Sequence, residues 1–289
     1  MADAHDSADS SIFASETSRR AFRRGAGIGR LFIATLLLSL ALSLPASAQT
    51  PEQLRSLRTD AEAGNPRAQY LLGRTLAKND LAEAFRWYKK AADQGQRDAE
   101  TSVGFAYLEG EGVAKDEAEA ARWYKKAADQ GEQLAQWQLA WMSQQGRGVP
   151  ANDEEAIKWY EAVIATDAAD GESGRHPMTE MAKPALADIY SRRSAISEVG
   201  LGAPKDPALG YYWLARAAEL DPELYAEKLA ERARSLSAEE RAGAEKKILG
   251  WATAKGHGGA EAFAPALAAL HAAAKAPQVA DPKKDDRQR

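Results

Sequence analysis

The sequence predicts an all-α fold, an α/α solenoid built from antiparallel helix pairs. One reason is that a tryptophan recurs every 36 residues, at Trp87, Trp123 and Trp159. A period in the thirties is typical of stacked helix pairs, in which each repeat buries its apolar face against the next. The other reason is composition. The chain is 45% hydrophobic and 28% charged, which is typical of globular proteins, and it is rich in alanine and poor in β-branched residues.

The residues around the tryptophans recur with them. The segment 86–95, Arg-Trp-Tyr-Lys-Lys-Ala-Ala-Asp-Gln-Gly, returns unchanged at 122–131. A shorter copy surrounds Trp159, and a more divergent copy surrounds Trp213 after a longer spacing that indicates an insertion. The sequence therefore predicts four repeats. Their predicted ranges are 65–95, 96–131, 132–167 and 176–220, with 168–175 as the insertion.

Each tryptophan helix has a predicted first residue. Seven residues before the tryptophans stand Asp80, Asp116, Asn152 and Asp206. Asp and Asn are preferred N-caps because their side-chain oxygen accepts a hydrogen bond from a first-turn amide, and losing such a cap costs about 1 kcal/mol. In the first three repeats a glutamate follows three residues later, which predicts a capping box. We therefore expect each tryptophan helix to begin at its cap.

The helix before each tryptophan helix carries a recurring apolar pattern. In the first repeat it is marked by Ala68, Leu72 and the small residue Gly73. A small residue lets the second helix approach closely, so each pair should form an antiparallel hairpin. The segments 166–179 and 191–199 depart from the pattern and are predicted to be surface loops. The marker residues of the fourth repeat are predicted to be Ala182, Leu186, Ala187 and Tyr190.

The two ends of the chain differ from the repeats. Residues 1–48 combine an arginine-rich leader, an apolar run at 31–44 and a small-x-small site ending at Ala48, which predicts a signal peptide cleaved after Ala48. Ser18-Arg19-Arg20 resembles a twin-arginine signal, whereas the leucine-dense run favours the Sec route. We expect a periplasmic mature chain without a membrane span. The other predicted segments are a capping half-repeat at 49–64, capping helices at 221–254, and an Ala-rich segment with a disordered charged tail at 255–289.

The repeats resemble the Sel1-like family, relatives of the tetratricopeptide repeat with a period of about 36 residues. The resemblance rests on the pattern A-x-x-x-[LV]-G-x-x-Y, then G-x-G-V, then D-x-x-x-A-x-x-W-Y-x-x-A-A-x-x-G, and it covers about residues 65–220. It implies a superhelix whose first helices line a concave groove. It also implies a role in protein–protein interaction, which is common among Sel1-like proteins.

Recurring and non-recurring aromatics are interpreted differently. Trp87, Trp123, Trp159 and Trp213 occupy one slot in every repeat, so we interpret them as packing residues of the shared stack. Residues that serve a ligand need not recur. Five non-recurring residues of the first helices are predicted to line the concave groove and bind a partner, with Arg67 and Glu100 at the rim of the groove. As an open alternative, Trp137 and Trp141 pack beneath the insertion. The five are Tyr70, Arg74, Phe105, Trp137 and Trp141.

Signatures of enzyme chemistry are sparse. The chain has no cysteine, so thiol catalysis, disulfides and cysteine-ligated metals are excluded. It also lacks H-E-x-x-H, G-x-S-x-G, S-x-x-K and a phosphate-binding glycine loop. His176, His257 and His271 are far apart in the sequence. We therefore predict no enzyme activity and no catalytic, cofactor or metal site, and a net charge of −4 gives no support for nucleic-acid binding.

The sequence thus predicts a periplasmic scaffold or regulator that binds another periplasmic or membrane protein. Cell-envelope or exopolysaccharide control is one expected setting, because some periplasmic relatives restrain sensor kinases or organise polymer secretion. A glycan-binding module that uses the aromatic residues, with a polysaccharide as partner, is an alternative. A hydrolase like the cysteine-rich Sel1 relatives is disfavoured, because those proteins depend on a disulfide in each repeat.

Overall fold

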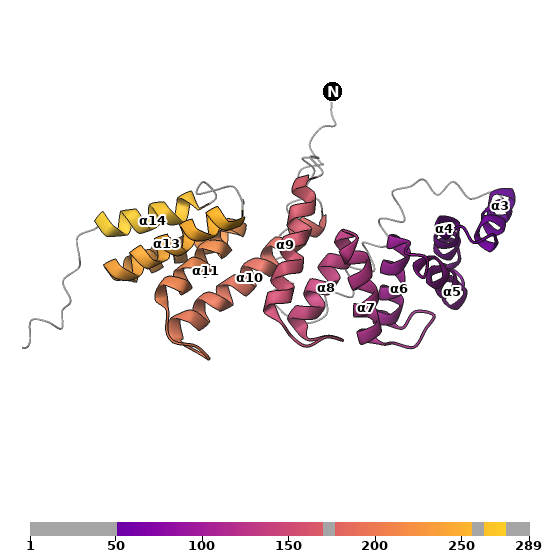
Figure 1. Cartoon of the computed structure of the whole chain (residues 1–289), viewed down its shortest axis with the longest axis horizontal. Helices are drawn as coiled ribbons and strands as arrows, with labels where there is room; N and C mark the ends of the chain where they lie inside the picture. The colour runs from indigo at the N-terminus through magenta and orange to yellow at the C-terminus, as the bar shows by residue number, and fades with distance from the viewer. Residues whose placement is uncertain (1–50, 170–176, 256–262, 276–289) are drawn as a thin grey trace, which may run out of the picture. The chain divides into compact units, whose positions relative to one another are not determined.

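The computed structural model describes residues 51–169, 177–255 and 263–275, and every regular element in these ranges is an α-helix (Figure 1). The predicted signal peptide, the centre of the predicted insertion, the charged tail, His176 and His257 lie outside the described residues. The helices are α3 (Pro51–Glu62), α4 (Pro66–Leu76), α5 (Leu81–Ala92), α6 (Arg97–Glu109), α7 (Glu117–Asp129), α8 (Gln133–Gln145), α9 (Asp153–Ala169), α10 (Pro177–Val199), α11 (Pro207–Leu220), α12 (Pro222–Ser235), α13 (Ala238–Lys255) and α14 (Ala264–Lys275).

The chain divides into two compact units, Met1–Ser56 and Leu57–Arg289. In the first unit the described residues are the opening turns of α3. The second unit holds the helix pairs α4–α5, α6–α7, α8–α9 and α10–α11, and the second helix of each of the first three pairs also packs on the first helix of the next pair. The predicted all-α solenoid of antiparallel helix pairs is therefore confirmed.

The hairpins of repeats one and two each have a ring packed on a glycine. A Cβ atom added to Gly73 of α4 would lie 2.7 Å from the ring of Tyr88 on α5. The same contact recurs one repeat later, where a Cβ on Gly104 would lie 2.9 Å from the ring of Tyr124. Larger residues at these glycines would therefore push the two helices apart, as the sequence pattern predicts.

The tryptophan helices begin at their caps. Asp80 Oδ1 accepts from Glu83 N at 2.8 Å, and Asp116 Oδ1 accepts from Glu119 N at 2.9 Å. The glutamates, however, have partners other than the predicted cap amide. Glu119 accepts from Trp123 Nε1 at 3.0 Å with one oxygen and from Arg122 Nε at 2.8 Å with the other. The remaining caps are Asn152, which accepts from Glu154 N at 2.9 Å, and Asp206, which accepts from Leu209 N at 2.8 Å.

The recurring tryptophans lie between successive repeats. Trp87, Trp123 and Trp159 are buried, whereas Trp213 is half-buried and stacks on Tyr190 with ring centroids 5.5 Å apart. Lysine side chains lie over the buried tryptophan rings. In two cases the lysine belongs to the preceding repeat, where it stands two residues after that repeat's own tryptophan. Lys89 Nζ lies 4.8 Å from the centre of the Trp123 ring, and Lys125 Nζ lies 5.3 Å from that of Trp159.

Helix α10 departs from the sequence prediction. Residues 191–199 were expected in a surface loop, but they are the last turns of a continuous helix. The edges of the predicted 166–179 loop are helical too, because α9 reaches Ala169 and α10 begins at Pro177. The helix packs on α9 and extensively on α11, and its buried side chains run from Met178 to Ser194.

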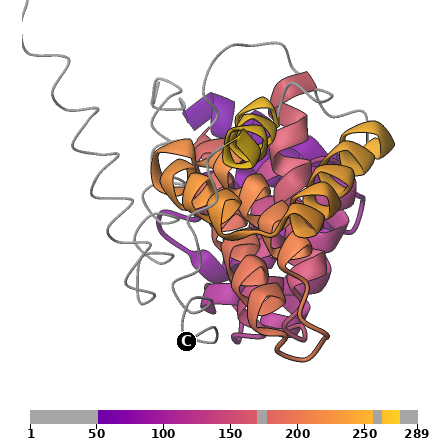
Figure 2. The ribbon, with the colours of Figure 1, turned by 90° about the vertical axis from the view of Figure 1, so that its left-hand side faces the viewer.

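Three helices follow the repeats (Figure 1 and Figure 2). Helices α12 and α13 both pack on α11, and α13 begins at a reciprocal capping box in which Ser237 N donates to Glu240 at 2.7 Å. The Ala-rich segment forms α14, which packs on α12 and buries Leu270. Pro265 lies in the first turn of this helix, where proline is tolerated.

Candidate partner-binding surface

Four of the five predicted partner-binding residues are half-buried on first helices. They are Tyr70 and Arg74 on α4, Phe105 on α6 and Trp141 on α8, and we call them the first-helix surface. The recurring marker Leu72, by contrast, is fully buried in the core of the first repeat. Residues outside the shared packing pattern therefore keep part of their side chains accessible.

Trp137 differs from the prediction because only 3% of its surface is exposed. Its helix, α8, packs on α7 and α9 and also contacts α10. The indole Nε1 of Trp137 has no hydrogen-bond partner among the described residues. Trp137 is therefore a core residue in this structure and is not available on an open groove wall.

The two residues predicted at the rim of the groove differ in their exposure. Arg67 is exposed, as a rim residue should be. Glu100 is buried, and one of its oxygens accepts from Gln130 Nε2 at 2.7 Å. Burial raises the pKa of Glu100 above its usual range, and nearby Lys126 opposes part of this shift. Glu100 therefore belongs to the contact between helices and not to the rim.

At the α4 end, the surface is an aromatic pair with a cation beside it. The rings of Tyr70 and Tyr88 lie 5.9 Å apart, and the Arg74 guanidinium carbon lies 5.7 Å from the Tyr70 ring centre. Burial raises the pKa of Tyr70, so its hydroxyl remains a neutral donor and acceptor at neutral pH. Tyr70 and Arg74 thus offer an aromatic ring, a hydroxyl group and a positive charge within about one turn of α4.

At the α8 end, a residue outside the prediction positions the tryptophan. The Arg147 guanidinium carbon lies 4.8 Å from the centre of the Trp141 ring, and Arg147 Nε donates to Glu117 Oε1 at 3.1 Å. The hydrogen bond from Arg147 lowers the pKa of Glu117, and Lys115 adds to this effect. Arg147 stands in a loop position that carries glutamate in repeat two and leucine in repeat four, and this non-recurring arginine was a signal that the sequence offered.

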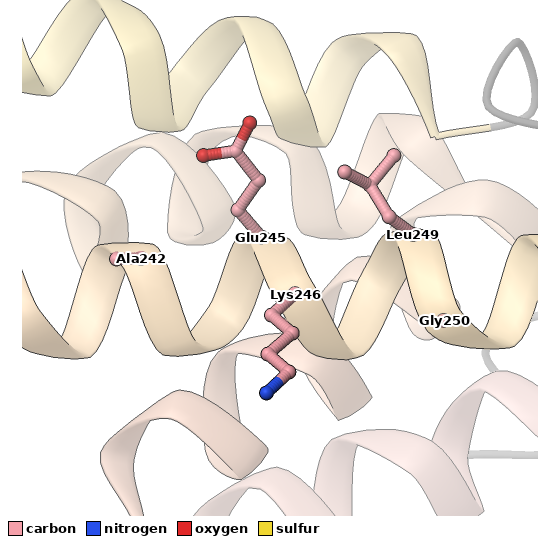
Figure 3. A pocket seen from close by; sticks show the side chains of 5 residues that line it. All are labelled: Ala242, Glu245, Lys246, Leu249 and Gly250. Atoms are coloured by element: carbon pink, nitrogen blue, oxygen red, sulfur yellow. The ribbon is translucent and has the colours of Figure 1, made fainter.

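A shallow hollow lies on α13, away from the first-helix surface. Figure 3 shows the five residues that line it, all from one helix, with Glu245 and Lys246 pointing to opposite sides. Glu245 Oε1 lies 3.2 Å from His271 Nε2 of α14, which places this predicted tail histidine on a helix. The residues of the hollow are Ala242, Glu245, Lys246, Leu249 and Gly250.

The described residues offer few chemical sites besides these. Within the described ranges, no group of three or more His, Cys, Asp or Glu side chains is arranged to hold a metal ion. None of the helices in these ranges is long and apolar enough to cross a membrane. The arrangement that remains is a set of half-exposed aromatic rings accompanied by arginines. Tyr, Trp and Arg are the residue types that most often dominate protein–protein binding energies.

Comparison with known families identifies the repeats. The model of the Sel1 repeat matches residues 66–96, 97–132, 133–162 and 193–222. The chain carries four Sel1 repeats. The first three matches each begin one residue after the predicted boundary, whereas the fourth begins at 193 instead of 176, inside the second half of α10. Sel1 repeats are commonly protein–protein interaction scaffolds, and their proteins are generally not enzymes.

Two solved structures are similar to the Sel1-repeat chain. A Sel1 repeat protein from Oxalobacter formigenes is 26% identical, with a TM-score of 0.43, over 66% of this chain and 72% of that one. A protective antigen present in uropathogenic Escherichia coli strains, displaying an SLR fold, is 27% identical, with a TM-score of 0.40, over 76% of this chain. The match spans 48% of the antigen's length. The sequence has no match among the curated proteins.

Proposed function

We propose that this Sel1-repeat protein is a periplasmic scaffold that binds a partner protein through the first-helix surface. The observation that carries the proposal is Trp141, which is half-exposed and held between α8 and the guanidinium of Arg147. Arg147 is in turn fixed by Glu117. A large ring whose orientation is already fixed loses little conformational entropy on binding, which is what an interface anchor requires.

The other members of the surface support the same reading. Tyr70 with Arg74, Phe105, and Trp141 stand on the first helices of three successive repeats, α4, α6 and α8. Because successive helix pairs stack, these residues form a series along the repeats instead of one pocket. A series of shallow contacts suits an extended peptide or a helix of a partner protein better than a small molecule.

The proposed location rests on the first 48 residues. A basic leader, an apolar run and a small-x-small site are the features of a secretory signal. Fractionation of cells that produce the full chain should place a shortened product beginning at Gln49 in the periplasm. Changing both Arg19 and Arg20 to lysine should abolish this export if the twin-arginine route is used, and leave it unchanged if the route is Sec. A full-length product in the cytoplasm would contradict the proposed location.

A photo-crosslinking residue at position 105 or 141 tests the binding surface in producing cells. The matched control carries it at position 122, because Arg122 is exposed on the second helix α7. We expect one protein to be captured from 105 and 141 and not from 122. Phe105→Ala and Trp141→Ala should each then weaken binding of that purified protein about tenfold, or 1.4 kcal/mol, whereas Arg122→Ala should not.

Two outcomes would contradict the proposed surface. One is equal capture from positions 122 and 141, and the other is unchanged affinity in both alanine variants, provided that their thermal unfolding matches the parent. If the parent chain binds a purified polysaccharide instead of a protein, and the Trp141→Ala variant does not, the glycan-binding alternative is favoured. The identity of the captured protein would show whether the scaffold serves cell-envelope or exopolysaccharide control.

A further inference from the structure

The connection between the two helices of each repeat is built in the same way three times. In repeat two Gly110 N donates to Ala106 O at 2.8 Å, and in repeat four Gly200 N donates to Ile196 O at 2.9 Å. Both helices end at a left-handed glycine, with φ of 79° at Gly110 and 75° at Gly200. The loop then closes when the cap amide donates to the first helix. These closing bonds are Asp116 N to Tyr107 O, Asn152 N to Ser143 O and Asp206 N to Ser197 O.

In repeats two and three this loop rests on the preceding repeat. A Cβ added to Gly112 would lie 2.1 Å from Leu81 O, in the first turn of α5. A Cβ added to Gly148 would lie 2.1 Å from Glu117 O, in the first turn of α7. The second glycine of each loop therefore sits directly on the backbone of the preceding tryptophan helix, at a distance that only glycine allows.

In repeat four the second glycine of the loop has no such contact. Gly202 has a φ of 77°, like its counterparts, but an added Cβ would meet no atom within 4 Å. The reason is the length of α10. The first turn of α9 faces Arg192 and Arg193, which pair with Asp153 and Glu154 at 3.3 and 2.6 Å. The helix then continues to Val199, about 9 Å beyond Arg193, and so carries the loop past that turn.

The displaced loop exposes apolar side chains that lie close together. Val199 is 73% exposed, Leu201 is 71% exposed and Ile196 is 41% exposed. We call residues 196–203 the repeat-four foot. In repeat three the residue at the position of Leu201 is Arg147, which contacts Trp141 and Glu117. Isolated exposed apolar residues are ordinary, but three in one short segment are typical of an interaction site.

The surface on which the foot would rest is present in the same chain. In repeats two and three the loop contacts the first turn of the preceding tryptophan helix, and for repeat four that turn is the start of α9, which is capped by Asn152. Asn152 and Glu155 are exposed, and the Glu154 side chain is 75% exposed. Asp153 and Glu154 pair with Arg192 and Arg193 of α10, at 3.3 and 2.6 Å. This turn is acidic, whereas the base of the foot carries the exposed Lys205. Each copy of the chain thus carries a repeat-four loop whose Gly202 touches no helix, and a first turn of α9 that this glycine does not reach.

We propose that two copies of the chain associate by placing the repeat-four foot of each on the first turn of α9 in the other. Two such contacts are related by a two-fold axis, so the assembly closes as a dimer. The contact is the intermolecular form of the loop contact that joins neighbouring repeats. It uses a surface different from the first-helix surface, and it stands whether or not that surface binds a partner.

Sedimentation of the full chain, purified in the form that producing cells accumulate, tests the dimer. We expect a concentration-dependent monomer–dimer equilibrium, weakened at least about tenfold by the double change Val199→Ser and Leu201→Ser. The matched control changes Leu224 and Leu249 to serine, because they are also exposed, at 37% and 39%, and lie outside the foot. The control should leave the equilibrium unchanged. A chain that stays monomeric up to about 100 µM, or equal weakening by both double variants, would overturn the proposal.

The absence of cysteine allows a second test of the partner surface. A chain with Leu201→Cys and Glu154→Cys should form a covalent dimer under mild oxidation, because the foot of one copy meets α9 of the other. The pair Leu224→Cys and Glu154→Cys is the matched control and should stay largely monomeric. Equal yields of covalent dimer from the two pairs would overturn the assigned contact, even if the chain dimerises.

Discussion

Arg216 on α11 donates to the Glu161 carboxylate on α9 at 2.8 Å, and this buried ion pair joins repeat three to repeat four. Both side chains also bond to the Tyr190 hydroxyl of α10. In the two preceding inter-repeat contacts, the residue that stands in the place of Glu161 is a lysine lying over the next tryptophan. The contact between repeats three and four thus uses an ion pair where the two preceding inter-repeat contacts use a lysine over a tryptophan ring.

Removing Arg216 should destabilise the protein strongly. Its side chain is 6% exposed, and its guanidinium carbon lies 3.7 Å from the centre of the Trp251 ring. Breaking a buried ion pair costs about 3–5 kcal/mol, because the remaining charge loses its partner. We expect Arg216→Ala to lower the free energy of unfolding in urea by about that amount. The double variant with Glu161→Ala should lose less than the sum of the single changes, and strict additivity would contradict the pairing.

Glu119 should stabilise the repeat through a tryptophan and not through a capping box. Its carboxylate accepts from the buried Trp123 indole at 3.0 Å. An unsatisfied buried donor costs about 1–3 kcal/mol, so Glu119→Ala should lower the midpoint of urea unfolding accordingly. Glu155→Ala is the matched control, because exposed Glu155 pairs with Lys158 at 3.8 Å and should matter by less than about 0.5 kcal/mol. Equal effects would show that the indole contact contributes nothing.

Local features of this fold could be predicted from sequence. Asp80 and Asp116 cap the helices that they precede, because a cap bond joins residues three apart and depends on little else. The glycine that ends α6 adopts a left-handed φ of 79° for an equally local reason. Close approach of paired helices was also predictable, since a small residue recurs opposite a ring, as Gly104 lies opposite Tyr124.

What the sequence could not supply depends on neighbours distant in the chain. Trp137 occupies a position off the recurring pattern, yet it is only 3% exposed, because helices that pack on α8 bury it. The residues 191–199 break the repeat pattern, so they suggested a loop, yet they continue α10, and the fourth Sel1 match begins within them, at 193. Arg216 recurs nowhere else in the repeats, and its partner Glu161 is recognisable only once α9 and α11 are brought together.

Glu100 should make stability depend on pH. It replaces the glutamines Gln69 and Gln136, whose amides donate to the carbonyls of Ala61 and Ala128 at 3.0 and 3.3 Å. Only a protonated Glu100 could make the equivalent bond, and burial raises its pKa above the usual 4.5. The folded state therefore holds this proton more tightly than the unfolded state. The stability from this group is complete below the unfolded pKa and is lost as the pH rises through the folded pKa.

Replacing Glu100 with glutamine tests this reading. Glu100→Gln should be more stable than the parent in urea at pH 7, and the difference should shrink as the pH falls toward 4.5, because the parent then becomes protonated. Lys126 is the charged neighbour that opposes the shift, so Lys126→Met should steepen the dependence. A constant difference between parent and Glu100→Gln from pH 4 to pH 8 would contradict the role of the proton.

Two glycines with nearly the same backbone should respond differently to alanine. Gly148 and Gly202 have φ of 66° and 77°, so alanine costs each about 1–2 kcal/mol in the left-handed region. Gly148→Ala also places its Cβ 2.1 Å from Glu117 O, and relieving that overlap should cost roughly 1–3 kcal/mol more. Urea unfolding of dilute, monomeric protein should therefore show a clearly larger loss for Gly148→Ala than for Gly202→Ala. Equal losses would mean that the repeat-three loop does not rest on α7, and would remove the internal example on which docking of the repeat-four foot is based.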